Sequence, residues 1–209
     1  MSESFNVSFS LDDARIKLKP AASLSELSRL EESVGSPLPP SFRWWLSQYE
    51  EAVFDIGNLL KIDSPFAVDN GFSIASQSEW YRNNPECRLK DLIVFGMNGV
   101  DSETWAFYTG VYDEDGEYPI IWISPGSLDS TAYVFANTRF DRFLNCQVNF
   151  LLAVDREDID DGQAGAELNA LYQRHEPVHR LKTSSFYRIA VDAETLRHQL
   201  SAFYSKDVR

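Results

Sequence analysis

Residues 23–49 constrain the fold of this chain more than any other stretch, because they predict two short helices joined by a proline-rich turn. Ser23 is followed three residues later by Glu26, which is the pattern of a capping box that satisfies two backbone donors at a helix start. Gly35 is placed to end this helix in a left-handed cap. Apolar residues recur at helical spacing between these two signals and predict a core-facing stripe of Leu24, Leu27, Leu30 and Val34.

Prolines at positions 37, 39 and 40 cannot extend the first helix, but proline is accepted in the first turn of a new one. We therefore expect a second helix that begins near Pro40 or Ser41. Its apolar residues share one face, which we expect to be core rather than binding surface, and this face carries Phe42, Trp45, Leu46 and Tyr49. The two helices and the prolines between them, residues 23–49, are called the elbow below, and we expect the elbow to carry out no chemistry.

Composition permits one sizeable domain and argues against several classes of protein. The 209 residues are 44% hydrophobic and 13% aromatic, so wholesale disorder is not expected. No apolar run approaches the ~20 residues of a membrane span, and residues 1–10 lack the pattern of a secretory signal. Cys87 and Cys146 are far apart and predict reduced thiols, which indicates a cytoplasmic protein.

The formal net charge of -13 argues against binding to a nucleic acid, which requires clustered lysine and arginine. An acidic chain suits a basic protein partner, because opposite fields speed association. The same charge also serves solubility, so both interpretations stay open at this point.

Downstream of the elbow, the pattern changes to short apolar strands separated by turn residues, which is typical of an antiparallel meander. Asp115-Gly116 is a strong turn signal between two of these strands. The predicted strands are 53–62, 92–97 (buried on both faces), 103–112, 118–124 and 132–136. The sequence thus predicts an α+β fold, with an N-terminal helix pair packed on a mainly antiparallel sheet, followed by C-terminal helices.

The C-terminal third predicts more helix. A stripe that begins at Phe140 and ends at Leu151 predicts a long helix, and Asp192 is placed to cap a last one. A helix over 163–174 and a strand over 185–191 are also expected. We expect one domain over residues 1–209, in which residues 145–209 are a C-terminal extension packed on the core.

The order of these motifs resembles the SUKH superfamily over residues 23–144. The elbow carries the family pattern at Glu31, Gly35, Leu38, Pro39, Phe42, Trp45 and Leu46, and matching segments follow at 91–99, 118–121 and 138–144. That superfamily includes fungal cell-wall assembly regulators and bacterial immunity proteins. The resemblance implies a non-enzymatic protein without a cofactor, which neutralises a bacterial toxin domain by direct binding, for instance by covering a basic nuclease-like site. A regulatory scaffold is the alternative within the same superfamily.

An acidic, aromatic hairpin is the predicted contact surface for such a partner. Between Leu92 and Pro119 the chain has six acidic residues and no lysine or arginine. Aromatic side chains supply anchoring area, and carboxylates select a basic partner. An ordinary hairpin with a solubilising tip explains the same residues. The candidate contact residues are Asp101, Glu103, Trp105, Tyr108, Tyr112, Asp113, Glu114, Asp115, Glu117 and Tyr118.

A metal enzyme or small hydrolase is the remaining alternative. Residues 175–179 match the zinc-protease pattern H-E-x-x-H, but Pro177 interrupts the helix that this site needs. The Gly96–Gly99 segment lacks the lysine of a phosphate-binding loop, and no Gly-x-Ser-x-Gly elbow is present. We therefore predict no metal site and no catalytic residue. Stoichiometric zinc in the purified protein would contradict this prediction.

Overall fold

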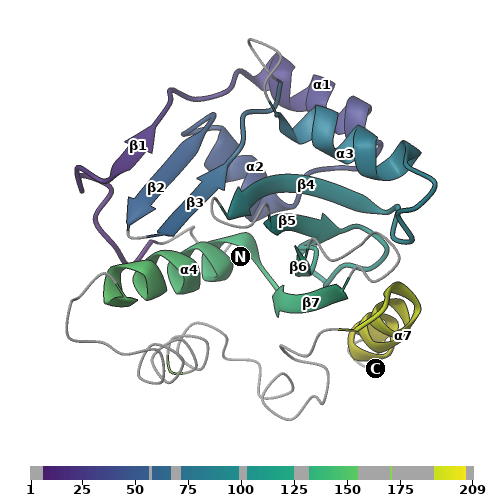
Figure 1. Cartoon of the computed structure of the whole chain (residues 1–209). Coiled ribbons are helices and arrows are strands. Elements are labelled where there is room, and N and C mark those ends of the chain that lie inside the picture. The colour runs from purple at the N-terminus through teal and green to yellow at the C-terminus, as the bar shows by residue number, and fades with distance from the viewer. Residues whose placement is uncertain are drawn as a thin grey trace.

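The computed structural model describes residues 7–56, 58–66, 72–98, 103–124, 132–154, 170 and 191–205. At its centre is a seven-stranded sheet in which the strands lie in chain order and every neighbouring pair is antiparallel (Figure 1). The strands are β1 (Ile16–Leu18), β2 (Ala52–Ile56), β3 (Asn58–Ile62), β4 (Leu92–Asn98), β5 (Glu103–Tyr108), β6 (Ile120–Ser124) and β7 (Ala132–Asn137).

Helices cover both faces of this sheet. The described helices are α1 (Leu24–Val34), α2 (Pro40–Leu46), α3 (Ile74–Asn83), α4 (Phe140–Val154) and α7 (Ala193–Tyr204). Buried residues of α1, α2 and α4 form a core with one face of the sheet, and those of α7 form a second core with the other face (Figure 1). Helix α3 lies beside α1 and β4. The predicted α+β class is confirmed.

The elbow folds as its sequence predicts. Ser23 Oγ accepts a hydrogen bond from the N–H of Glu26 at 3.2 Å, and the Glu26 carboxylate accepts one from the N–H of Ser23 at 2.8 Å. Gly35 ends α1 with φ of 74°, and α2 begins at Pro40. The prediction of a core-facing stripe is wrong for Leu24. This residue is 69% exposed, because it is the first helical residue and lies in the exposed start of α1.

The predicted strand over residues 53–62 is wrong, because the chain reverses there and forms the hairpin of β2 and β3. In this hairpin, Ala52 faces Ile62 and Phe54 faces Leu60. All four side chains are buried in the same core. The inward positions stay in phase across the reversal, so one long strand and a tight hairpin produce the same apolar alternation.

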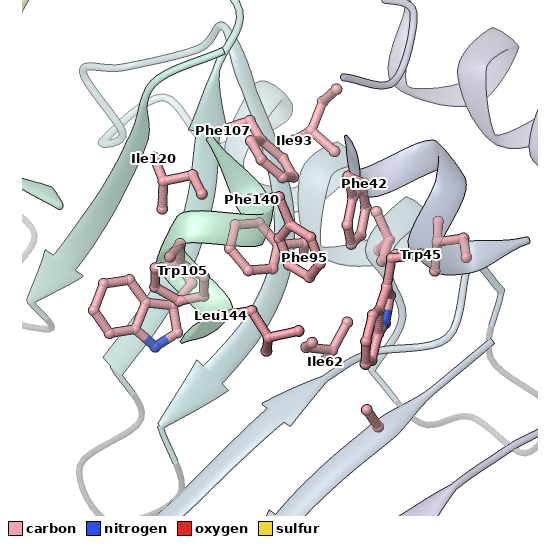
Figure 2. Packing of buried hydrophobic residues seen from close by; sticks show 14 of the residues in the cluster. Phe42, Trp45, Ile62, Ile93, Phe95, Trp105, Phe107, Ile120, Phe140 and Leu144 are labelled. Carbon is pink, nitrogen blue, oxygen red and sulfur yellow. The ribbon is translucent and has the colours of Figure 1, made fainter. Parts of the chain in front are cut away.

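The core that joins the elbow to the sheet is built around Phe42 of α2 (Figure 2). Its ring centroid lies 5.5 Å from that of Phe95, 5.0 Å from Phe107 and 4.8 Å from Phe140. These partners come from β4, β5 and α4, so a single side chain links three elements. Aromatic pairs at these separations stabilise by about 0.5–1.5 kcal/mol beyond their buried area.

Strand β4 is buried on both faces, as its continuous apolar run predicts. Ile93 and Phe95 lie in the core beneath α2 and α4, whereas Leu92 and Val94 lie in the core beneath α7. A register shift between Val94 and Gly96 marks a bulge opposite β5. The extra residue lets the strand continue without losing its two-sided burial.

The backbone of β4 passes close to β3 at Gly96, and this predicts that Gly96→Ala will destabilise the fold. A Cβ at this position would overlap the carbonyl oxygen of Lys61 and lie 3.2 Å from the carbonyl carbon. Both obstacles are backbone atoms, so we expect a loss of about 1–3 kcal/mol or more in the free energy of unfolding, measured by chemical denaturation.

Gly35→Ala is the matched control for this prediction. At Gly35 nothing lies within 4 Å of the added methyl group, and only the positive φ is strained. We expect a loss of about 1–2 kcal/mol, the usual cost of a left-handed conformation. A Gly96→Ala variant as stable as the wild type would contradict the close approach of β3 and β4.

Candidate functional site

The connection between β5 and β6, residues 109–119, carries most of the exposed residues of the predicted contact set and is called the acidic loop below. Its tip is a tight turn. Asp113 Oδ1 accepts hydrogen bonds from the N–H groups of Asp115 at 3.0 Å and Glu117 at 2.9 Å. Gly116 adopts φ of 80° at the predicted turn position and donates its N–H to the Asp113 carbonyl. The tip is therefore ordered by its own side chains and backbone.

Glu117 fastens the acidic loop to the elbow. Glu117 is 1% exposed, and its carboxylate accepts hydrogen bonds from the N–H and the Oγ of Ser41, each at 2.7 Å. Ser41 is the second residue of α2, and Pro39 before that helix makes no side-chain cap. The first N–H groups of a helix lack partners inside it. Glu117 therefore supplies, from far along the chain, the cap that the proline-rich elbow cannot supply itself.

Burial raises the pKa of Glu117 above its ordinary value. The hydrogen bonds from Ser41 and the positive charge of Arg139 oppose this rise and do not cancel it. Arg139 is itself buried, and its guanidinium contacts Asp141 at 3.1 Å and Asp115 at 3.6 Å. Glu117, Arg139 and Asp141 thus form a small cluster of charges at the base of the acidic loop, and Asp141 belongs to the first turn of α4.

Further contacts pack the acidic loop against the elbow and order the loop itself. A Cβ built on Gly116 would lie 3.9 Å from two ring carbons of Pro40, so the turn rests against the first residue of α2. Tyr118 is buried beside Tyr112, with 6.4 Å between the ring centroids. The acidic loop and the elbow are therefore neighbours, although the sequence separates them widely.

The structure divides the predicted contact residues into two groups. Tyr112 is 67% exposed, Glu114 and Asp115 are exposed, and Asp113 is half-buried. These four make up the tip. Glu103 is the first residue of β5, and Asp101 lies outside the described residues.

Four of the predicted contact residues are buried, so they are not exposed to a partner in this fold. Both faces of the sheet are covered, so inward and outward positions of β5 are both core: Trp105 lies in the core beneath α4 and Tyr108 in the core beneath α7. Glu117 binds Ser41 of the elbow, and Tyr118 is buried in the core that contains Phe42. Alternation on a strand predicts which residues share a face, but not whether a helix covers that face.

A family model described as SMI1 / KNR4 family (SUKH-1) matches residues 21–146. This range is more than half of the chain and includes the elbow, the acidic loop and the start of α4. The chain belongs to the SMI1 / KNR4 family (SUKH-1). A search of curated proteins found no match. The expected resemblance to the SUKH superfamily is thereby confirmed.

The structure of this SUKH-1 member offers no metal centre among the residues that it describes. No group of three or more His, Cys, Asp or Glu side chains in the described ranges is arranged to hold a metal ion. The H-E-x-x-H pattern at 175–179 lies outside those ranges. Cys87 and Cys146 are both buried free thiols, and burial raises the pKa of Cys87. In the same part of the chain, no helix is long and apolar enough to cross a membrane.

Sequence reasoning missed one exposed aromatic residue on α2, the helix whose first residue lies against the acidic loop. Trp44 of α2 is 44% exposed, whereas its neighbour Trp45 is fully buried. Helical spacing could have found it, because Phe42, Trp45 and Leu46 share the core face and Trp44 falls outside that stripe.

The raised pKa of Glu117 predicts a pH-dependent difference in stability between the wild type and Glu117→Gln. The folded chain holds the proton of Glu117 more tightly than the unfolded chain, so this proton stabilises the fold below about pH 4.5, the ordinary pKa. That contribution is lost as the pH rises through the folded pKa. We therefore expect the wild type to lose stability relative to Glu117→Gln across this window, measured by urea denaturation from pH 4 to 8.

The difference in stability between the wild type and Glu117→Gln reports the titration of Glu117 alone. Asp63, whose pKa is also raised by burial, titrates in both proteins, so its effect cancels. A pH-independent difference would contradict the raised pKa. Glu117→Ala separates capping from titration. It leaves the buried N–H of Ser41 without this acceptor, and we expect it to be about 1–3 kcal/mol less stable than Glu117→Gln at every pH.

Proposed function

We propose that this protein is an immunity protein that neutralises a bacterial toxin domain by binding it directly, and that it covers a basic, nuclease-like active site. Membership of the SUKH-1 family supports a binding role. The observation that carries the proposal is the exposed tip of the acidic loop, Tyr112 to Asp115, on a chain with a net charge of -13. A carboxylate-rich tip of this kind fits a cleft whose natural ligand is a phosphate backbone.

The fixed conformation of the tip favours tight binding. Ordering a loop on association costs free energy, and a loop that is already ordered avoids much of that cost. The turn is held by Asp113, and its base is held by the buried bonds between Glu117 and Ser41. The tip therefore presents its charges in one arrangement before a partner arrives.

The direct test uses the toxin gene that we expect beside this one. The C-terminal domain of that toxin is expressed in bacteria alone and together with this protein. We expect the toxin domain to stop growth, and co-expression to restore growth and give a complex that co-purifies. Failure to protect against, and to bind, the toxin domain encoded next to it would contradict the proposed function.

Removing the charges of the tip should slow association. In the triple variant Asp113→Asn, Glu114→Gln and Asp115→Asn, the side chains keep their shape, and position 113 keeps an oxygen for the turn. We expect the association rate with the toxin domain to fall about tenfold at low ionic strength and its salt dependence to flatten. Stopped-flow or surface plasmon resonance measurements over a series of salt concentrations provide the check.

A second triple variant has the same net charge and leaves the tip intact. It carries Asp12→Asn, Asp55→Asn and Glu194→Gln, all at exposed positions outside the acidic loop. We expect only a small change in its association rate. Equal rates for the two variants would show that total charge, rather than the tip, steers the partner.

A further inference from the structure

Helix α2 carries an exposed aromatic residue one turn away from its contact with the acidic loop. Pro40 is exposed and lies against Gly116 of the turn. Trp44 is four residues further along α2 and is 44% exposed. Residues at this spacing lie on the same side of a helix. Trp44 therefore borders the surface that begins at the tip of the loop and continues over Pro40.

The basic groups beside this surface already have acidic partners. Arg43 contacts Glu31 at 3.4 Å, and the buried Arg139 contacts Asp141 and Asp115. Glu114 adds an exposed carboxylate at the tip. A cationic group that approaches Trp44 thus meets an acidic surface whose neighbouring arginines are engaged.

We propose that Trp44 and the acidic tip form one composite surface, in which the indole of Trp44 receives an arginine side chain of a basic protein partner while the carboxylates of Asp113, Glu114 and Asp115 bind the surrounding basic groups. Arginine suits both halves, because its planar guanidinium stacks on aromatic rings and pairs with carboxylates. The identity of that partner as a toxin domain rests on the proposed function. The composite surface itself rests on the geometry of α2 and the loop.

The carboxylates of the tip and the indole of Trp44 are expected to affect different rate constants of binding. The carboxylates act at long range and set the association rate. Trp44 acts only on contact, as central aromatic anchors do, and sets the dissociation rate. The two halves can therefore be separated in kinetics, even though they touch the same partner.

A small probe tests the surface without the toxin. The ¹⁵N-labelled protein has five tryptophans, whose indole N–H signals are followed by NMR while the peptide acetyl-Arg-Gly-Arg-Gly-Arg-amide is added. The variant Trp44→Phe assigns the signal of Trp44. We expect this signal to shift saturably with the arginine peptide and not with the same peptide containing citrulline. In the Asp113→Asn, Glu114→Gln, Asp115→Asn variant, we expect at least a several-fold weaker apparent affinity.

Trp80 provides the internal control for this titration. It is 50% exposed on α3, with neither Pro40 nor the acidic loop among its described ring partners. We expect its signal to move much less than that of Trp44. A silent Trp44 signal, equal shifts at both tryptophans, or equal shifts with the citrulline peptide would each overturn the composite surface.

Kinetics with the toxin domain complete the test. We expect Trp44→Ala to raise the dissociation rate roughly 30-fold while the association rate stays near that of the wild type, and Trp80→Ala to change neither. An unchanged dissociation rate in a folded Trp44→Ala variant, checked by circular dichroism, would overturn the inference while toxin binding stands. A Trp44 shift with the arginine peptide in a protein that neither binds nor neutralises the toxin domain would instead reject the proposed function alone.

Discussion

The hydrogen bonds from Ser41 to the buried carboxylate of Glu117 connect helix α2 to the acidic loop. They complete the start of α2, which has no side-chain cap of its own, and they hold the acidic loop against the elbow. The ring of Phe42, the next residue, fixes the same helix to β4, β5 and α4. Helix α2 is thus held by a polar bond at its start and an aromatic cluster on its inner face. Its outer face carries the exposed residues Trp44 and Pro40.

The covered sheet explains why the exposed acidic and aromatic residues lie on a loop and a helix face rather than on a strand. Helices α2 and α4 cover one face, and α7 covers the other, so side chains of both orientations on β4 and β5 are core. Trp105 and Tyr108 are therefore used for packing. The exposed side chains of the predicted contact set gather where the chain leaves the sheet, which is where loops on a rigid scaffold commonly carry function.

Much of the local structure could be predicted from the sequence, because its signals depend on near neighbours. The capping box of Ser23, the left-handed cap at Gly35 and the cap at Asp192 are short-range hydrogen-bond patterns, and all three form. Apolar alternation does not distinguish the β2–β3 hairpin from one strand, because its inward positions stay in phase across the turn, and the signal that marks the reversal is Gly57-Asn58. The exposure of the predicted contact residues was anticipated only in part. Tyr112 to Asp115 are at the tip, but the burial of Glu117 depends on Ser41, which no local pattern connects to it.

The sequence by itself determined helices α1, α2, α4 and α7, strands β4 to β7, the α+β class and the resemblance to the family that the chain belongs to, because spacing, caps and turn residues act over a few positions. It also determined the acidity that suits a basic partner. Only the tertiary structure decided which acidic and aromatic residues are exposed, because burial depends on which helix covers which face. It also brought the elbow beside the acidic loop. That contact joins Pro40 to Gly116 and Ser41 to Glu117, and no signal within either segment could specify it.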